Sequence, residues 1–127
     1  MKAPSPVILA ALLLLAHGAP SGAQKQARWA CRGKTTLQIE KCFSAQLDRE
    51  DEKLRQVSAR VRTSIDTSAR VLMDSAGAAW ARYRNAQCMS VYQSYAGGSL
   101  AGLQLLTCKV ALTQERLRAL GYLYSMQ

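Results

Sequence analysis

The sequence predicts a small all-α protein, an antiparallel bundle of three helices tied by two disulfides. Three observations support this prediction. All three prolines lie within the first 20 residues, so the strongest helix breaker is absent from the rest of the chain. Apolar residues recur at helical spacing in three segments with short breaks between them. The four cysteines, an even number, are Cys31, Cys42, Cys88 and Cys108.

Residues 1–23 have the layout of a secretory signal peptide. Lys2 gives a basic start, residues 7–16 form the apolar run VILAALLLLA, and the small residues Ser21 and Ala23 precede the expected cleavage after Ala23. The apolar run has roughly half the length needed to span a bilayer, and no later stretch approaches it. We therefore expect an exported protein, periplasmic or secreted, with no integral membrane segment after cleavage. In that oxidising setting, two disulfides are the expected state of the cysteines.

Cleavage would also remove residues that common catalytic and metal sites require. The only histidine is His17, so neither a Ser-His-Asp or Cys-His nucleophile nor a His-ligated zinc site is available after residue 23. The cysteines show no C-x-x-C spacing, which argues against a structural metal. Half of the 8 acidic residues fall in one charge run and the others are scattered. We expect no enzymatic activity, no metal and no cofactor.

The composition is strongly basic, with 17 Lys and Arg against 8 Asp and Glu and a formal net charge of +9, of which Lys2 belongs to the leader. Such a charge favours anionic partners, although it also serves solubility alone. The basic residues are scattered, with no Lys/Arg-rich run typical of a nucleic-acid-binding arm. We expect a protein partner and no nucleic acid, and the sequence leaves the oligomeric state open.

The first helix follows an N-terminal arm over residues 24–34 and opens the helical domain, residues 35–127. Thr35 or Thr36 can cap it, with Gln38 reaching back to a free backbone N–H. Its apolar stripe is Phe43, Leu47, Leu54, Val57, Val61 and Ile65. A break is predicted near residues 64–68, SIDTS, because Ser, Asp and Thr are helix-start residues.

The charge run DREDEK, residues 48–53, fills the gap in that stripe and the opposite side of the helix. We predict a solvated face there. The alternative is an acidic patch for a partner, made of Asp48, Glu50, Asp51 and Glu52.

A second helix is predicted over residues 69–95, and the AGGS turn at residues 96–99 ends it with positive-φ glycines and a serine cap for the next helix. The predicted inner stripe is Leu72, Ala76, Ala79, Trp80, Tyr83, Gln87, Val91 and Tyr95. Gly77 costs about 1 kcal/mol relative to alanine unless a neighbouring helix packs closely there. We expect Arg84 to lie on an aromatic ring or to pair with an acid of a neighbouring helix.

The third helix has the most regular periodicity, with spacings of three and four throughout. Its stripe is Leu103, Leu106, Val110, Thr113, Leu117, Leu120 and Tyr124. Short connections between three amphipathic helices imply an up-down-up bundle.

Bundle geometry ranks the disulfide pairings. Cys88 lies ten residues before Gly98 and Cys108 ten after it, so an antiparallel hairpin places the two at the same height. Cys31 would then pair with Cys42, which requires Cys31 to lie outside the helix, because eleven helical residues span about 16 Å. The competing scheme pairs Cys42 with Cys88, at equal height about residue 66, and Cys31 with Cys108. The first scheme is preferred.

One set of residues carries a family resemblance. Its parts are the Cys31 to Cys42 step, the motif W-x-x-Y-R-x-x-x-C at Trp80, Tyr83, Arg84 and Cys88, a Gly-Gly-Ser turn, and C-x4-T-x2-R at Cys108, Thr113 and Arg116. This pattern resembles the small exported bacterial proteins of the lysozyme inhibitor LprI-like family, over residues 31–120. The resemblance implies a helical periplasmic or secreted protein, in a family with reported lysozyme inhibitors. It makes the dense stretch at residues 79–88 a structural signature, not an active site.

Two functions remain as hypotheses. The first is inhibition of an extracytoplasmic wall hydrolase by binding, through Gly97, Gly98 and Ser99 or through the acidic patch. Animal-type lysozymes are basic and repel a basic protein, which makes local acidic groups relevant. The second is an envelope adaptor or surface-binding module that uses its positive charge on anionic lipid, glycan or an acidic protein.

Overall fold

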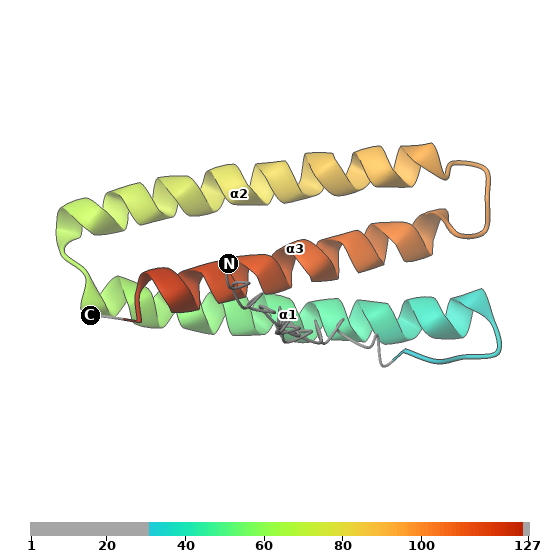
Figure 1. Cartoon of the computed structure of the whole chain (residues 1–127), viewed down its shortest axis with the longest axis horizontal. Helices are drawn as coiled ribbons and strands as arrows, with labels where there is room; N and C mark the ends of the chain where they lie inside the picture. The colour runs from blue at the N-terminus through green and yellow to red at the C-terminus, as the bar shows by residue number, and fades with distance from the viewer. Residues whose placement is uncertain (1–30, 126–127) are drawn as a thin grey trace, which may run out of the picture.

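The computed structural model describes residues 31–125, in which three long helices follow one another: α1 (Thr36–Ser64), α2 (Thr67–Ser94) and α3 (Ala101–Leu123). Successive helices run in opposite directions (Figure 1). The predicted signal peptide, residues 1–23, and residues 24–30 of the arm lie outside the described residues. None of the three helices combines the length and the hydropathy needed to cross a membrane.

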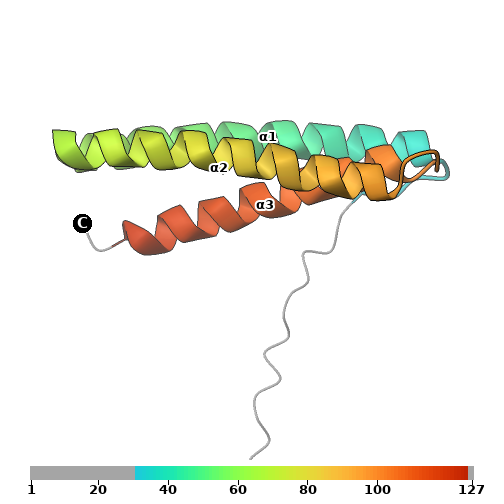
Figure 2. The same cartoon turned by 90° about the horizontal axis from the view of Figure 1, so that it is seen from above.

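The helices form an open arrangement in which α3 packs against both of the others, whereas α1 and α2 make little contact with each other. Figure 2 shows α3 on one side of the α1–α2 pair and diverging from them toward its carboxyl end. The fold is therefore the predicted three-helix bundle, with α3 as the common packing partner.

The start of α1 follows the predicted capping pattern. The Thr35 hydroxyl accepts a hydrogen bond from the backbone N–H of Gln38 at 3.3 Å, and the Gln38 side chain accepts one from the backbone N–H of Lys34 at 2.9 Å. These contacts satisfy backbone donors that have no partner within the helix.

The break between α1 and α2 also follows from local residues. Asp66 caps α2, because its carboxylate accepts hydrogen bonds from the Ser68 hydroxyl at 2.6 Å and from the backbone N–H of Ala69 at 2.8 Å. Those two hydrogen bonds hold the pKa of Asp66 below its ordinary value. A carboxylate at a helix N-terminus also complements the helix dipole.

The start of α3 differs from the prediction, because Ser99 does not cap it. Leu100 occupies the cap position, and no side chain hydrogen-bonds to the first turn. Gly97 has φ 84°, a conformation that glycine adopts without strain. The Glu40 carboxylate of α1 lies against Gly102, since a Cβ added there would be 2.6 Å from Glu40 Oε1. This negative charge sits where the α3 dipole favours it.

The apolar stripes predicted for the first and third helices are confirmed. Every member of both stripes is buried or half-buried. The main apolar cluster lies beside the α1–α2 connection and consists of Val61, Ile65, Met73 and Leu120. Smaller buried groups, among them Phe43 and Val110, extend the core toward the other end.

The inner stripe predicted for the second helix is confirmed at Trp80 and Val91 and wrong at its other six positions. Leu72 is 71% exposed and Tyr83 53% exposed, and Ala76, Ala79, Gln87 and Tyr95 also face solvent. The residues turned inward along the middle of the helix include Met73, Gly77, Trp80, Arg84, Cys88 and Val91. Cys88 must face α3 to form its disulfide, and the residues four, eight, eleven and fifteen positions earlier share its helical face. The disulfide therefore sets the rotation of α2.

Two disulfides join Cys31 to Cys42 and Cys88 to Cys108, with Cα–Cα separations of 5.5 and 5.6 Å. This is the pairing that the predicted helix register favoured. Cys31 precedes α1 and folds back onto it, whereas Cys88 and Cys108 link α2 to α3.

Gly77 gives a first testable prediction. A Cβ at this position would meet nothing within 4 Å, so no neighbouring helix requires glycine there. We expect Gly77→Ala to raise the free energy of unfolding by about 1 kcal/mol, because alanine has the higher helix propensity. Urea denaturation followed by circular dichroism measures this change. An unchanged or lower stability would mean that the fold depends on glycine at this position.

Candidate functional site

Arg84 forms the centre of a polar clamp that joins all three helices. Its Nη1 donates hydrogen bonds to Asp51 of α1 at 2.5 Å and to Thr113 of α3 at 2.7 Å. Its guanidinium carbon lies 4.9 Å from the centroid of the Trp80 ring. Both roles expected for Arg84 are therefore present together. We call Asp51, Trp80, Arg84 and Thr113 the polar clamp.

The polar clamp is partly shielded, and its polar groups have partners within the bundle. The Arg84 side chain is 19% exposed and Thr113 is fully buried, whereas the Asp51 side chain is 41% exposed. The Thr113 hydroxyl donates to the Lys109 carbonyl at 2.8 Å and so accepts from Arg84. Because each group is engaged within the bundle, the clamp stabilises the helix arrangement. Tyr83, the remaining aromatic residue of the signature, lies outside it on the solvent face.

The acidic residues of the charge run, Asp48, Glu50, Asp51 and Glu52, which we call the acidic run, do not form one patch, and the predicted solvated face is wrong at Glu50. Glu50 is only 8% exposed, and its carboxylate accepts a hydrogen bond from Gln114 of α3 at 3.4 Å. Asp51 belongs to the polar clamp. Glu52 faces solvent, where its hydrogen bond with Arg55 lowers its pKa. Of these four acidic residues, all within residues 31–125, Asp48 is the one that has no side-chain hydrogen bond or ion pair.

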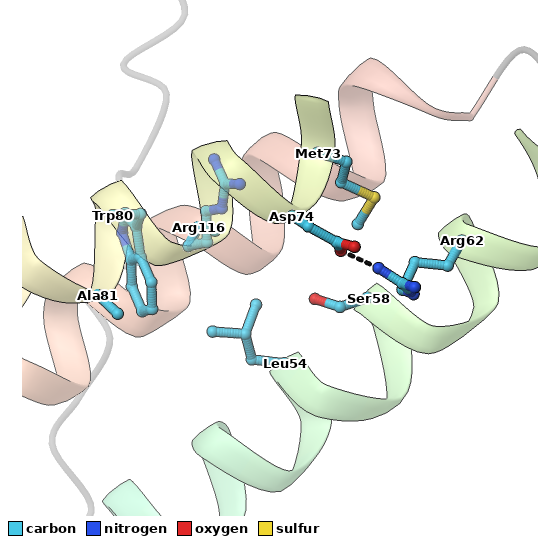
Figure 3. Close-up of a pocket in the computed structure, with 9 residues that line it drawn as sticks. Leu54, Ser58, Arg62, Met73, Asp74, Trp80, Ala81 and Arg116 are labelled. Carbon is cyan, nitrogen blue, oxygen red and sulfur yellow. Dashed lines mark hydrogen bonds and ion pairs between the residues drawn. The ribbon is translucent and has the colours of Figure 1, made fainter. Parts of the chain in front are cut away.

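A groove of about 230 Å³ opens between α1 and α2, with α3 behind it (Figure 3). Its apolar lining is Leu54, Met73, Gly77, Trp80 and Ala81, and its polar lining is Ser58, Arg62, Asp74 and Arg116. Arg62 and Asp74 form an ion pair between α1 and α2. The groove exists because α1 and α2 do not pack together and because Gly77 contributes no side chain.

Arg116 lies in this groove and not in the polar clamp. It is half-buried, yet within residues 31–125 it makes no hydrogen bond and no ion pair. The family resemblance included Arg116, but the sequence did not predict which residues lie beside it. The groove itself was missed, because its walls come from three separate helices.

Gly97, Gly98 and Ser99 lie at the exposed turn between α2 and α3, at the same end of the bundle as the start of α1 (Figure 1). We call residues 92–100 the hairpin tip. Tyr95 and Leu100 are 44% and 46% exposed within it. No charged residue occurs anywhere between Arg84 and Lys109. The Cys88–Cys108 disulfide closes the base of this uncharged hairpin.

The described part of the chain shows no cluster of side chains suited to bind a metal ion. Residues 31–125 contain no group of three or more His, Cys, Asp or Glu side chains that could hold a metal ion, and no free cysteine.

A family model described as lysozyme inhibitor LprI matches residues 30–120. The matched range includes both disulfides, the polar clamp, the groove and the hairpin tip. Comparison with curated proteins and with solved structures gave no match.

Proposed function

The chain belongs to the lysozyme inhibitor LprI family, and from this we propose that it is an exported, non-enzymatic protein that inhibits a lysozyme or related cell-wall hydrolase by binding it. The observation that carries the proposal is the family match over residues 30–120. Two disulfides support an oxidising, extracytoplasmic setting. The inward-facing polar clamp supports a role in binding over one in catalysis.

We propose the hairpin tip as the contact with the hydrolase. Without residues 1–23 the chain has 16 Lys and Arg against 8 Asp and Glu, a net charge of +8, and is repelled by a basic lysozyme, but residues 85–108 place no charge in the interface. Tyrosine, serine and glycine provide contact area and adaptable hydrogen bonds, as they do in antibody loops. The Cys88–Cys108 disulfide restrains the tip before binding and so reduces the entropy lost on association. The acidic run offers less, because Glu50 is buried and Asp51 is held by Arg84.

A lysis assay tests the proposed function. The oxidised protein without residues 1–23 is added to bacterial wall suspensions, and the loss of turbidity is followed with several types of lysozyme. We expect saturable inhibition of at least one type. The reduced and alkylated protein serves as the control. Absence of inhibition at large molar excess across all types would contradict the proposal. Salt-sensitive binding to anionic vesicles or glycans would then favour the adaptor function.

The hairpin tip gives a second prediction. Ser99→Arg introduces a positive charge into the proposed contact, and we expect inhibition of a basic lysozyme to weaken roughly tenfold, equivalent to about 1.4 kcal/mol. Added salt should reduce the difference by screening. Ser75→Arg, at an exposed position of α2, adds the same charge outside the tip. If both variants weakened inhibition equally, net charge and not the tip would control binding.

A further inference from the structure

We propose that the half of the bundle farthest from the hairpin tip binds the surface of an anionic lipid bilayer, with arginines on the lipid phosphates and exposed apolar side chains among the headgroups. This half comprises residues 53–77 and 116–125, and we call it the basic half. The proposal goes beyond hydrolase inhibition and does not depend on it. An excess of positive charge and a group of exposed apolar side chains carry it.

The basic half carries most of the net positive charge of residues 31–125. It contains 7 Lys and Arg against 2 Asp, whereas the rest of residues 31–125 contains 7 Lys and Arg against 6 Asp and Glu. These basic residues are scattered in the sequence. The fold gathers them, because the last turns of α1 and α3 and the first turns of α2 lie together around the main apolar cluster (Figure 1). Such a surface attracts anions.

Several arginines of the basic half have charge available for a ligand. A surface hollow of about 410 Å³ is lined by Ala59, Arg62, Thr63 and Arg70. Arg62 is paired with Asp74. Arg70 forms no ion pair within residues 31–125, and neither do the exposed Arg60 and Arg118. Arginine is well suited to bind phosphate oxygens, because its planar fork can donate two hydrogen bonds at once.

The four most exposed large apolar side chains of residues 31–125 also belong to the basic half. They are between 64% and 82% exposed, and they are Val71, Leu72, Tyr122 and Leu123. Tyrosine is typical of the headgroup level of a membrane, and aliphatic side chains gain free energy when they leave water for the lipid beneath it. A soluble polyanion offers the same charge but no apolar phase. The combination therefore favours a bilayer.

The charge also argues against a second copy of the chain as the occupant, because two basic halves repel each other. Binding through the basic half leaves the hairpin tip free, since the tip lies at the opposite end of helices that are about 35–44 Å long (Figure 1). The bilayer contact and the proposed hydrolase contact therefore occupy separate surfaces.

Vesicle flotation tests the proposal. The oxidised protein without residues 1–23 is mixed with vesicles of equal parts phosphatidylglycerol and phosphatidylcholine, and vesicles of phosphatidylcholine alone are the comparison. We expect binding to the anionic vesicles to be tighter by about tenfold or more, and to weaken as salt is raised.

Two pairs of arginine substitutions distinguish the basic half from net charge alone. Arg60→Gln, Arg70→Gln removes two charges from the basic half, and we expect vesicle binding to weaken roughly twentyfold. Arg49→Gln, Arg82→Gln removes two exposed charges from elsewhere, and we expect a loss of about twofold or less. Arg60→Gln alone, at an exposed position, should weaken binding about fivefold. Thermal midpoints from circular dichroism verify that each variant is folded.

A second comparison distinguishes a bilayer from a soluble polyanion. Leu72→Ser, Tyr122→Ser removes two exposed apolar side chains from the basic half, and we expect anionic vesicle binding to weaken about tenfold. Leu37→Ser, Tyr83→Ser is the matched control elsewhere and should bind like the unaltered protein. The proposal is overturned if anionic vesicles bind no more tightly than neutral ones, if the two arginine pairs behave alike, or if the first serine variant keeps full affinity. The last result would instead favour an anionic glycan or acidic protein.

Discussion

Replacement of Arg84 by methionine should lower the free energy of unfolding by about 3 kcal/mol. Methionine keeps an unbranched apolar stem but removes every donor, so Asp51 and Thr113 lose their shared partner and the Trp80 ring loses its cation. Removal of one member of a buried ion pair costs about 3–5 kcal/mol. The lower end applies here because Asp51 is 41% exposed and water can replace part of the lost interaction.

Chemical denaturation of both proteins measures this difference. Arg82→Met is the matched control, because Arg82 lies on the solvent face of the same helix and forms no ion pair within the described residues. Arg84→Lys should fall between the two, since it keeps the charge but loses the planar fork. Equal stabilities for the Arg84 and Arg82 methionine variants would show that the polar clamp does not stabilise the bundle.

Loss of the Cys88–Cys108 disulfide is the second large effect. The Cys88→Ala, Cys108→Ala double variant releases a loop with a sequence separation of 20. We expect a loss of about 3 kcal/mol from the greater chain entropy of the unfolded state. The variant also removes the covalent restraint at the base of the hairpin tip. Inhibition of lysozyme should therefore weaken even at temperatures where the protein remains folded.

The other disulfide provides the control. Cys31→Ala, Cys42→Ala opens a shorter loop, with a separation of 11, and the loop-length term predicts a loss smaller by about half a kcal/mol. That disulfide attaches the residues before α1 and does not enclose the hairpin tip. Inhibition should be preserved in this variant at temperatures where it stays folded. Equal loss of inhibition in both double variants would argue against the tip as the contact.

The accuracy of the sequence predictions differed between the helices for physical reasons. The stripes of α1 and α3 each have one strong apolar face, so periodicity identified it. In α2, two adjacent stripes are almost equally apolar, one through Leu72 and Tyr83 and the other through Met73 and Trp80. Periodicity cannot separate faces that differ by one residue. The choice depends on Cys88 and Arg84, whose partners lie on other helices.

In the acidic run, too, contacts between nearby residues were predictable and contacts between helices were not. Glu50 and Asp51 look like neighbouring surface charges in the sequence. In the structure they accept hydrogen bonds from Gln114 and Arg84, which lie 64 and 33 residues away on other helices. Glu52 behaved as expected because Arg55 is only three residues distant. The cap at Asp66 was likewise predictable, whereas Glu40 beside the start of α3 was not.

The sequence by itself determined the three helices, the two breaks between them and the preferred cysteine pairing, because caps, turns and helix register depend on residues near one another in the chain. Only the tertiary structure decided the rotation of α2, the polar clamp and the groove that holds Arg116. Each of these features joins side chains from different helices. A charged or polar group is stable away from water only when it has a partner, and here the partner lies on another helix.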